Sequence, residues 1–366
     1  MKTTTESKEK RRRLLDYMKR KGLKGVALTQ IRNFAWYTCG RDNHVAGATE
    51  MGFATVIVTP ERQCVVTSNI EAGRIAAEEV GEDFEVHAHP WHDDAQKNAL
   101  IRKLLGTKRA ASDDGVAGLP LLDPDFAELR WTLTPEEIKR YGEVGRAAGA
   151  VMGAVCREIT PGMRESDVAG LLAGGCLREQ VTPTVILIAA DERVFQFRHP
   201  IVTGKKVRKH IMVVLCAARY GLVCSLTRLV HFGRLPADLR RKHEACVAVD
   251  AAFNLGSRPG RTAGEVFRDA TAVYAQHGFP GEWQHHHQGG LAGYKEREYV
   301  ANAADRHEIV LNQSFAWNPS IQGTKSEDTI IVTAAGPEVI TSSPGWPMLD
   351  AAFGDRVLPR PAILEK

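Results

Sequence analysis

Three consecutive histidines, His285 to His287, stand in the run Trp-Gln-His-His-His-Gln-Gly-Gly over residues 283–290. Imidazole nitrogens bind zinc and other transition metals, and an ordinary histidine can also transfer protons at neutral pH. Along a strand, alternate side chains point to opposite faces, so His285 and His287 would share a face that excludes His286. Strand geometry therefore allows His285 and His287, but not all three histidines, to face one site. A metal bound there would need further ligands from elsewhere in the chain.

The composition predicts an ordinary globular protein of about two domains. The chain has 366 residues, 43% of them hydrophobic and 25% charged, with a net charge of +4. The basic run over residues 8–13 could touch nucleic acid or a membrane, but a solvated start of a helix explains it more simply. The N-terminus is charged, no apolar run is long enough to span a bilayer, and the seven cysteines form no CxxC pair. We expect a reduced, cytoplasmic protein that binds neither nucleic acid nor membrane.

Residues 1–130 are predicted to form an α/β domain, because strand and helix patterns alternate along them. The expected elements are a helix over 11–21, strands over 25–29, 53–58, 63–67 and 85–88, and a helix over 69–80.

Residues 131–366 are predicted to form a second domain that opens with a long helix. Thr134 is a good N-cap, Pro135 suits the first helical position, and Glu137 completes a capping box. This helix should end near residue 158. The later expected elements are a helix from Ser166, strands over 184–188, 210–217, 221–228, 315–319 and 328–333, and helices over 236–255 and 263–277.

The order of these elements and motifs resembles the creatinase/aminopeptidase-P/prolidase superfamily, the pita-bread proteins of family M24. In the first domain the similar segments are Arg12 to Thr29 and Tyr37-Thr-Cys-Gly. In the second they are Thr160-Pro-Gly-Met-Arg-Glu, Ser225-Leu-Thr-Arg and Ser326-Glu-Asp-Thr. The resemblance implies an α/β creatinase-type N-terminal domain followed by an α+β pita-bread catalytic domain.

The resemblance also implies a metal site, and this sequence departs from it. Metallopeptidases of the superfamily hold two divalent ions with two aspartates, one histidine and two glutamates. The aspartate positions fall on Leu215 and Leu226, eleven residues apart, and the first glutamate position falls on Asn318. Only His287, in His-x-x-Gly, and Glu327, in Glu-Asp-Thr, keep a ligand type. We therefore expect no dinuclear centre, no metal and no other cofactor.

Creatinase, a member of the superfamily that works without metal, hydrolyses a C–N bond of a guanidino compound with a histidine. That histidine lies in a loop before the first aspartate strand, and the matching residue in this chain is His199. We expect His199 to act as acid and base. Glu327, His287 and Asn318 are expected to position water and substrate.

Each of these residues also has a structural alternative. His199 could be a packed loop residue, and Asn318 a hydrogen-bonded amide in the turn before Pro319. Glu327 could form a structural ion pair with Lys325 or Arg228.

Seven further residues are candidates for substrate binding. Arginines can clamp a carboxylate, and Tyr294 takes the position of a second histidine in the metallopeptidases. Arg228 could instead be structural, and the loop around Tyr294 could be a solvated charged loop. The resemblance implies a homodimer in which the N-terminal domain reaches the partner's active site, although exposed turn residues are the alternative there. The candidates are Arg198, Arg228, Tyr294, Glu296, Trp317, Arg41 and His44.

The function we expect is hydrolysis of a C–N bond in a small guanidino, amidine, lactam or amide compound, without metal and with His199 as the acid–base group. A lyase or cyclase using the same histidine is a variant of this hypothesis. A ligand-binding protein without activity, or an Xaa-Pro-type peptidase with an unusual metal site, are the alternatives. Cys216 and Cys224 could serve as nucleophiles, but buried structural cysteines are commoner.

Overall fold

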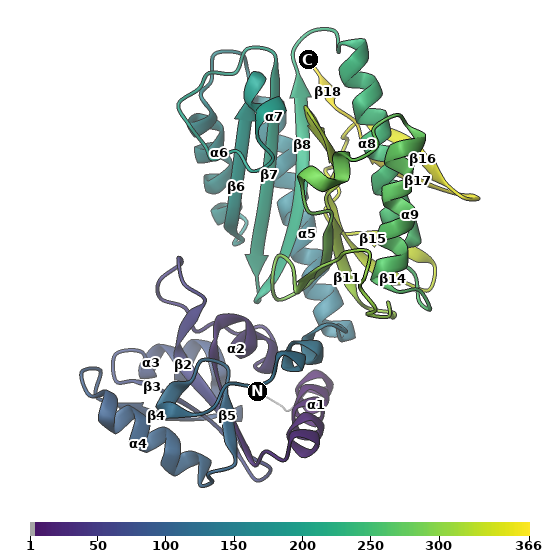
Figure 1. The fold of residues 1–366 in the computed structure, drawn as a ribbon. Coiled ribbons are helices and arrows are strands. Elements are labelled where there is room, and N and C mark those ends of the chain that lie inside the picture. Colours follow the sequence, from purple (N-terminus) through teal and green to yellow (C-terminus); the bar gives the residue numbers. More distant parts are fainter. Residues whose placement is uncertain (1–3) are drawn as a thin grey trace. The chain divides into compact units, whose positions relative to one another are not determined.

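The computed structural model describes residues 4–366 and divides into two compact units, Met1–Arg130 and Trp131–Lys366. Figure 1 shows each unit as an assembly of strands flanked by helices. No helix within residues 4–366 has the length and apolar character needed to cross a membrane.

The first unit is a five-stranded sheet with helices packed against it. The strands lie in the order β4-β3-β2-β1-β5. The first helix starts where the Thr4 side chain accepts a hydrogen bond from Ser7 N, and it ends at Gly22, whose left-handed conformation suits glycine. The elements are α1 Thr5–Lys21, β1 Gly25–Gln30, α2 Ile31–Tyr37, β2 Met51–Val58, β3 Gln63–Ser68, α3 Ala72–Arg74, η1 Ile75–Val80, η2 Gly81–Asp83, β4 Glu85–His89, α4 Asp94–Leu105, β5 Ala110–Ser112, η3 Val116–Gly118 and η4 Pro124–Arg130.

The second unit opens with the predicted capped helix. Thr134 and Glu137 form both hydrogen bonds of the capping box, and Pro135 is the first helical residue. The helices and first strands are α5 Pro135–Glu158, α6 Glu165–Arg178, β6 Thr182–Ala190, α7 Glu192–Gln196, β7 His210–Arg219, β8 Leu222–His231, α8 Ala237–Gly256, α9 Ala263–Gln276 and η5 Glu282–His285. The remaining strands are β9 Gly289–Ala292, β10 Tyr299–Val300, β11 Ser314–Trp317, β12 Ser320–Ile321, β13 Thr324–Lys325, β14 Asp328–Thr333, β15 Gly336–Val339, β16 Met348–Phe353, β17 Arg356–Pro361 and β18 Leu364–Glu365.

Two sheets form the body of the second unit. One has the order β18-β8-β7-β6 and contacts α5 and α6, and the other has the order β10-β9-β11-β14-β15 and contacts α8 (Figure 1). The sheets meet where β8 approaches β14, because Thr227 N donates to Glu327 O at 3.1 Å and the Thr329 hydroxyl bonds the backbone of Ser225. This junction carries Glu327 into the interior.

Buried ion pairs lock the strand that follows Glu327. Asp328 accepts from Arg228 and Arg360, each at 2.9 Å, and Arg360 also bonds Asp250 of α8 at 2.6 Å. All four side chains are at most 1% exposed. Because a buried charge is costly without a partner, this network fixes strand β17 against β14 and α8.

The two-domain α/β and pita-bread fold class is confirmed, and most elements match their predicted ranges within a few residues. The helix expected over residues 69–80 is instead a short α-helix and a π-helical turn, Ala72–Arg74 and Ile75–Val80. The sequence patterns gave no expectation for α2, α4, β9 or the β16–β17 hairpin.

Candidate functional site

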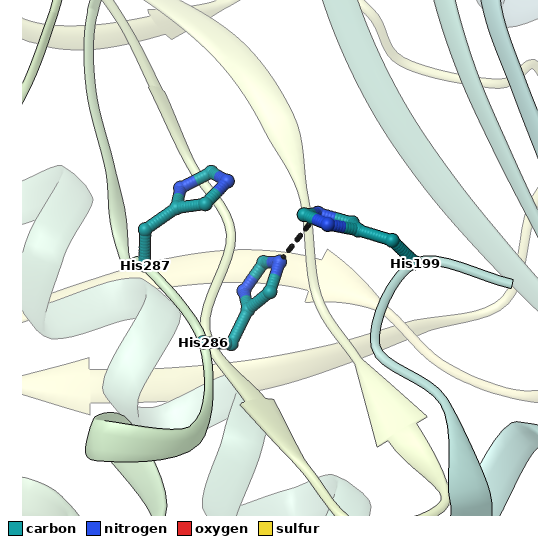
Figure 2. Close-up of side chains that lie close together, drawn as sticks. All are labelled: His199, His286 and His287. Carbon is teal, nitrogen blue, oxygen red and sulfur yellow. Dashed lines mark hydrogen bonds between the residues drawn. The ribbon is translucent and has the colours of Figure 1, made fainter.

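Three imidazoles, those of His199, His286 and His287, converge in the second unit (Figure 2). One ligand-type nitrogen from each lies within 4.8 Å of those of the other two. His199 and His286 share a hydrogen bond of 3.0 Å between their Nε2 atoms, and the rings of His286 and His287 stack with centroids 4.4 Å apart. We call these three residues the histidine cluster.

The local backbone decides which histidines join the cluster. The segment before β9 is a 3-10 helix that ends at His285, and His286 and His287 follow it before the strand begins at Gly289. The expected strand alternation is therefore wrong for this run. His286 is buried and bonds His199, whereas His285 is exposed and outside the cluster.

Gln288 holds the histidine segment in place, and sequence reasoning did not single it out. Its amide nitrogen donates to the backbone oxygens of Trp283 and His286, and its oxygen accepts from the Tyr274 hydroxyl at 2.8 Å. The sequence signal that could have found it is its place between the histidines and the paired glycines. Gly289 has a φ of +94°, and a Cβ there would lie 2.2 Å from Ala316 O, so only glycine fits this approach to β11.

The surroundings keep the imidazoles neutral. Burial lowers the pKa of His286 to about 2, and the Lys325 ammonium lowers it further. Burial, with Arg297 and Lys325, lowers the pKa of His287 to about 4. The pKa of His199 is lowered by burial and by Lys325. A neutral imidazole can accept a proton or bind a metal, so the cluster is in the form that either chemistry requires.

Glu327 lies beside the cluster in a compact group of charges. One carboxylate oxygen accepts from Thr227 Oγ1 at 2.7 Å and pairs with Lys325 Nζ at 2.8 Å. The other pairs with Arg297 Nη2 at 3.0 Å. Burial raises the pKa of this carboxyl, but Lys325, Arg297 and Thr227 outweigh burial and lower the pKa to about 2. Among residues 4–366, no hydrogen bond joins Glu327 to an imidazole.

Glu327 therefore matches its structural alternative in part. Its ion pair is with Lys325, while Arg228 pairs with Asp328 instead. Arg297 was not singled out as a partner of Glu327, because only the tertiary fold brings the two loops together. We call Arg297 and Lys325 the cation pair.

The residues at the family's metal positions do not fit a dinuclear centre. Leu215 of β7 and Leu226 of β8 face each other as direct cross-strand partners, and both are fully buried. Two opposed leucine side chains replace two opposed carboxylates, and they supply neither ligand atoms nor negative charge. Glu327, the one carboxylate kept, is already neutralised by the cation pair.

Asn318 follows β11 and is placed beside the histidine segment. Its backbone N donates to Gln288 O at 3.1 Å, and its side chain is 2% exposed. The side-chain oxygen is buried without a hydrogen-bond partner among the described residues. A buried acceptor left unpaired is costly, which is typical of a group that meets a ligand or water.

Three of the residues predicted to bind substrate are buried and make structural contacts. Arg228 is 1% exposed, and its guanidinium bonds Asp328, Ser343 and backbone oxygens, so it is structural. Trp317 is fully buried, stacks on Phe253 and donates to Ser257 Oγ, so it belongs to the core.

Tyr294 is 2% exposed and donates to Glu137 Oε1 at 2.6 Å, which ties its loop to the start of α5. This bond gives the Tyr294 side chain a structural role, and its contact with substrate stays a prediction.

The other candidates have mixed surroundings. Arg198 precedes His199, but its guanidinium pairs with Glu282 at 2.6 Å and bonds Ser320 Oγ. Glu296 is partly buried in the loop between β9 and β10. Arg41 and His44 belong to the first unit, where the exposed His44 ring bonds Asp42, and their proposed contact with a partner subunit stays a prediction.

The cysteines of β7 and β8 are poor nucleophiles. Cys216 and Cys224 are buried, and burial raises the pKa of Cys216 to about 12 and that of Cys224 further still. Thiolate formation is therefore suppressed, and both residues belong to the packed sheet.

Comparison with known proteins places this site in context. Residues 139–334 match the sequence family described as metallopeptidase family M24. The chain is 25% identical over 353 residues to the probable dipeptidase PepE of Mycobacterium tuberculosis. This match covers 88% of this chain and 91% of that protein. It is 21% identical over 354 residues to the Xaa-Pro dipeptidase of Pyrococcus horikoshii, covering 92% and 97%.

The fold is also found among solved structures. The Xaa-Pro dipeptidase from Bacillus anthracis superposes with a TM-score of 0.78 at 19% identity, covering 98% of this chain and all of that one. The match to family M24 over residues 139–334 confirms the superfamily resemblance. The three relatives are named as dipeptidases, so the narrower form of the resemblance, a creatinase-like member, is not supported.

Proposed function

This chain belongs to metallopeptidase family M24, and we propose that it hydrolyses a C–N bond of a small polar substrate without the dinuclear metal centre of that family. The observation that supports this most directly is the histidine cluster, which lies beside Glu327 while the carboxylate positions are occupied by Leu215 and Leu226. The site offers neutral imidazoles for catalysis, and it lacks the set of carboxylates that would bridge two metal ions.

In the proposed reaction, His199 is the proton-transfer group. It takes a proton from an attacking water, whose oxygen bonds to the substrate carbon, and it gives the proton to the leaving nitrogen as the C–N bond breaks. His199 is exposed, so a substrate can reach it, and its bond to the buried His286 fixes the ring. Asn318, with an unpaired carbonyl oxygen, is suited to accept an N–H of the substrate.

An amide or peptide bond is the C–N bond to test first. The relatives are named as dipeptidases, and two of them as Xaa-Pro dipeptidases. Guanidino and lactam compounds follow, as the wider class of C–N substrates.

The test is a turnover screen by mass spectrometry with dipeptides and small amides, first with the wild type and then with His199→Ala. General acid–base groups contribute about 10²- to 10⁴-fold, so we expect at least a 100-fold loss of kcat/KM. His285→Ala is the matched control, because it removes an exposed neighbouring histidine outside the cluster. Full activity in His199→Ala contradicts the mechanism, and a ligand that binds but is never consumed favours a non-catalytic binding protein.

A second candidate is a peptidase with a single metal ion held by His199, His286 and His287. Three converging neutral imidazoles are a known ligand set for catalytic zinc, which is the observation that favours it. The cation pair opposes it, since two positive side chains act on the same imidazoles. Elemental analysis decides between the candidates: one equivalent of metal, lost in His286→Ala and kept in His285→Ala, establishes the metal site.

A further inference from the structure

The charged side chains that act on His199 and His287 leave an excess of one positive charge. Lys325 and Arg297 are cationic, Glu327 is the carboxylate between them, and these side chains are the charges that act on His199 and His287. The neighbouring Arg198 and Glu282 cancel as an ion pair at 2.6 Å. Since the opposed positions of β7 and β8 hold Leu215 and Leu226, no further carboxylate comes from those strands.

The cation pair is also incompletely satisfied. The Arg297 side chain is 10% exposed, with Nη1 bonded to Ser225 Oγ and Glu296 O and Nη2 to Glu327. Its Nε–H is buried and has no partner among the described residues. A buried N–H of a guanidinium costs free energy when unpaired, so this donor is suited to an acceptor that the protein does not supply.

We propose that the site beside the histidine cluster binds the carboxylate of an anionic small molecule. Arg297 and Lys325 would supply the positive charge that two metal ions supply in the family. The positive excess attracts an anion, and the free Arg297 Nε–H gives it a directional hydrogen bond. The same charge repels a guanidinium group, so a guanidinium compound without a carboxylate should bind poorly.

This inference rests on the proposed function for the identity of the site, and it narrows the substrate to C–N compounds that carry a carboxylate. Binding of the anion can be measured without any turnover. Failure of the anion-site hypothesis can therefore be distinguished from failure of the proposed hydrolysis.

The experiment titrates the full-length protein with acetate, acetamide and guanidinium at constant ionic strength. The readout is the NMR signals of histidines labelled at Cε1, assigned with His199→Ala and His287→Ala. Acetate should shift the His199 and His287 signals saturably, with an affinity at least tenfold higher than that of the neutral isostere acetamide, and guanidinium should give no saturable shift.

Variants of Arg297 connect the binding to the cation pair. Arg297→Gln should weaken acetate binding about tenfold or more, and Arg297→Lys should restore part of it because the charge returns without the fork of donors. Arg306→Gln is the matched control. It also removes one positive charge from the second unit, but at an exposed arginine. Circular dichroism of each variant checks that it is folded.

The outcomes separate cleanly. Guanidinium binding as tight as acetate binding, or acetate binding that is unchanged in Arg297→Gln, overturns the inference. Acetate binding that depends on Arg297, in a protein that consumes no amide, supports the anion site and counts against the proposed hydrolysis. Turnover of neutral amides in preference to carboxylate-bearing ones supports the hydrolase and overturns the anion site.

Discussion

Glu327→Gln should cost the second unit several kcal/mol at neutral pH, and the cost should shrink in acid. The carboxylate is 2% exposed and holds the cation pair and Thr227 at 2.7 to 3.0 Å. Glutamine keeps the shape but leaves two buried cations without a counter-charge. Removing one partner of a buried ion pair typically costs about 3 to 5 kcal/mol.

The pH dependence follows from the depressed pKa of Glu327. The pKa is about 2 in the folded chain, against an ordinary value of 4.5 for a glutamate. A depressed carboxyl pKa stabilises the fold above the unfolded value, and this contribution is lost as the pH falls toward the folded value. The difference corresponds to about 3 kcal/mol at pH 7, of which about 2 kcal/mol should be lost by pH 3.

The assay is equilibrium urea unfolding of the wild type and Glu327→Gln at pH 6 and at pH 3. The difference in free energy of unfolding between the two proteins should be about 3 kcal/mol or more at pH 6, and about 2 kcal/mol smaller at pH 3. Glu338→Gln, an exposed carboxyl on β15, serves as the control and should change stability little at either pH. A difference for Glu327→Gln that stays constant between the two pH values refutes the assignment of this carboxylate as the ionised partner of the cation pair.

Three further predictions concern the site, the loop that carries it and the assembly. Because the pKa of His199 is lowered from 6.5, the acid limb of the kcat/KM profile should fall as the pH drops through a value below 6.5, and a limb centred above 6.5 would contradict His199 as the base. Gly323→Ala should reduce the free energy of unfolding by about 1 to 3 kcal/mol and so lower the melting temperature, because a Cβ there would lie 2.3 Å from the Phe195 ring at a φ of +97°. Differential scanning calorimetry measures this change, and Gly204→Ala, which has open space around it, is the control. Light scattering should give the mass of a dimer, as the superfamily resemblance implies, and a monomer at micromolar concentration would refute that.

The local patterns determined much of the fold because each depends on neighbours in the sequence. The capping box at Thr134, Pro135 and Glu137 forms as predicted, since its hydrogen bonds span three residues. The strand β14, Asp328–Thr333, was predicted to the residue from its apolar, β-branched run. The loss of the metal carboxylates could likewise be seen from Leu215 and Leu226, because a ligand type is a property of the residue itself.

The histidine run marks where such reasoning ends. Its residue types pointed to a site, but the alternation rule selected His285 and His287, and the chain at that point is a 3-10 helix followed by three residues before the strand. Sequence could not decide this, because the turn of the backbone is set by the packing of Gln288 against Tyr274 and by the approach of Gly289 to β11.

Sequence by itself determined the fold class, the superfamily, the absence of the carboxylate set and the candidacy of His199 and Glu327. Tertiary structure decided that His286 is the partner of His199, and that Arg297, thirty residues before Glu327, neutralises that carboxylate. The physical reason is the distance along the sequence between the residues that make contact. Helix caps and strand patterns arise from contacts a few residues apart, whereas the charge and hydrogen bonding of a buried site are summed over side chains that only folding brings together.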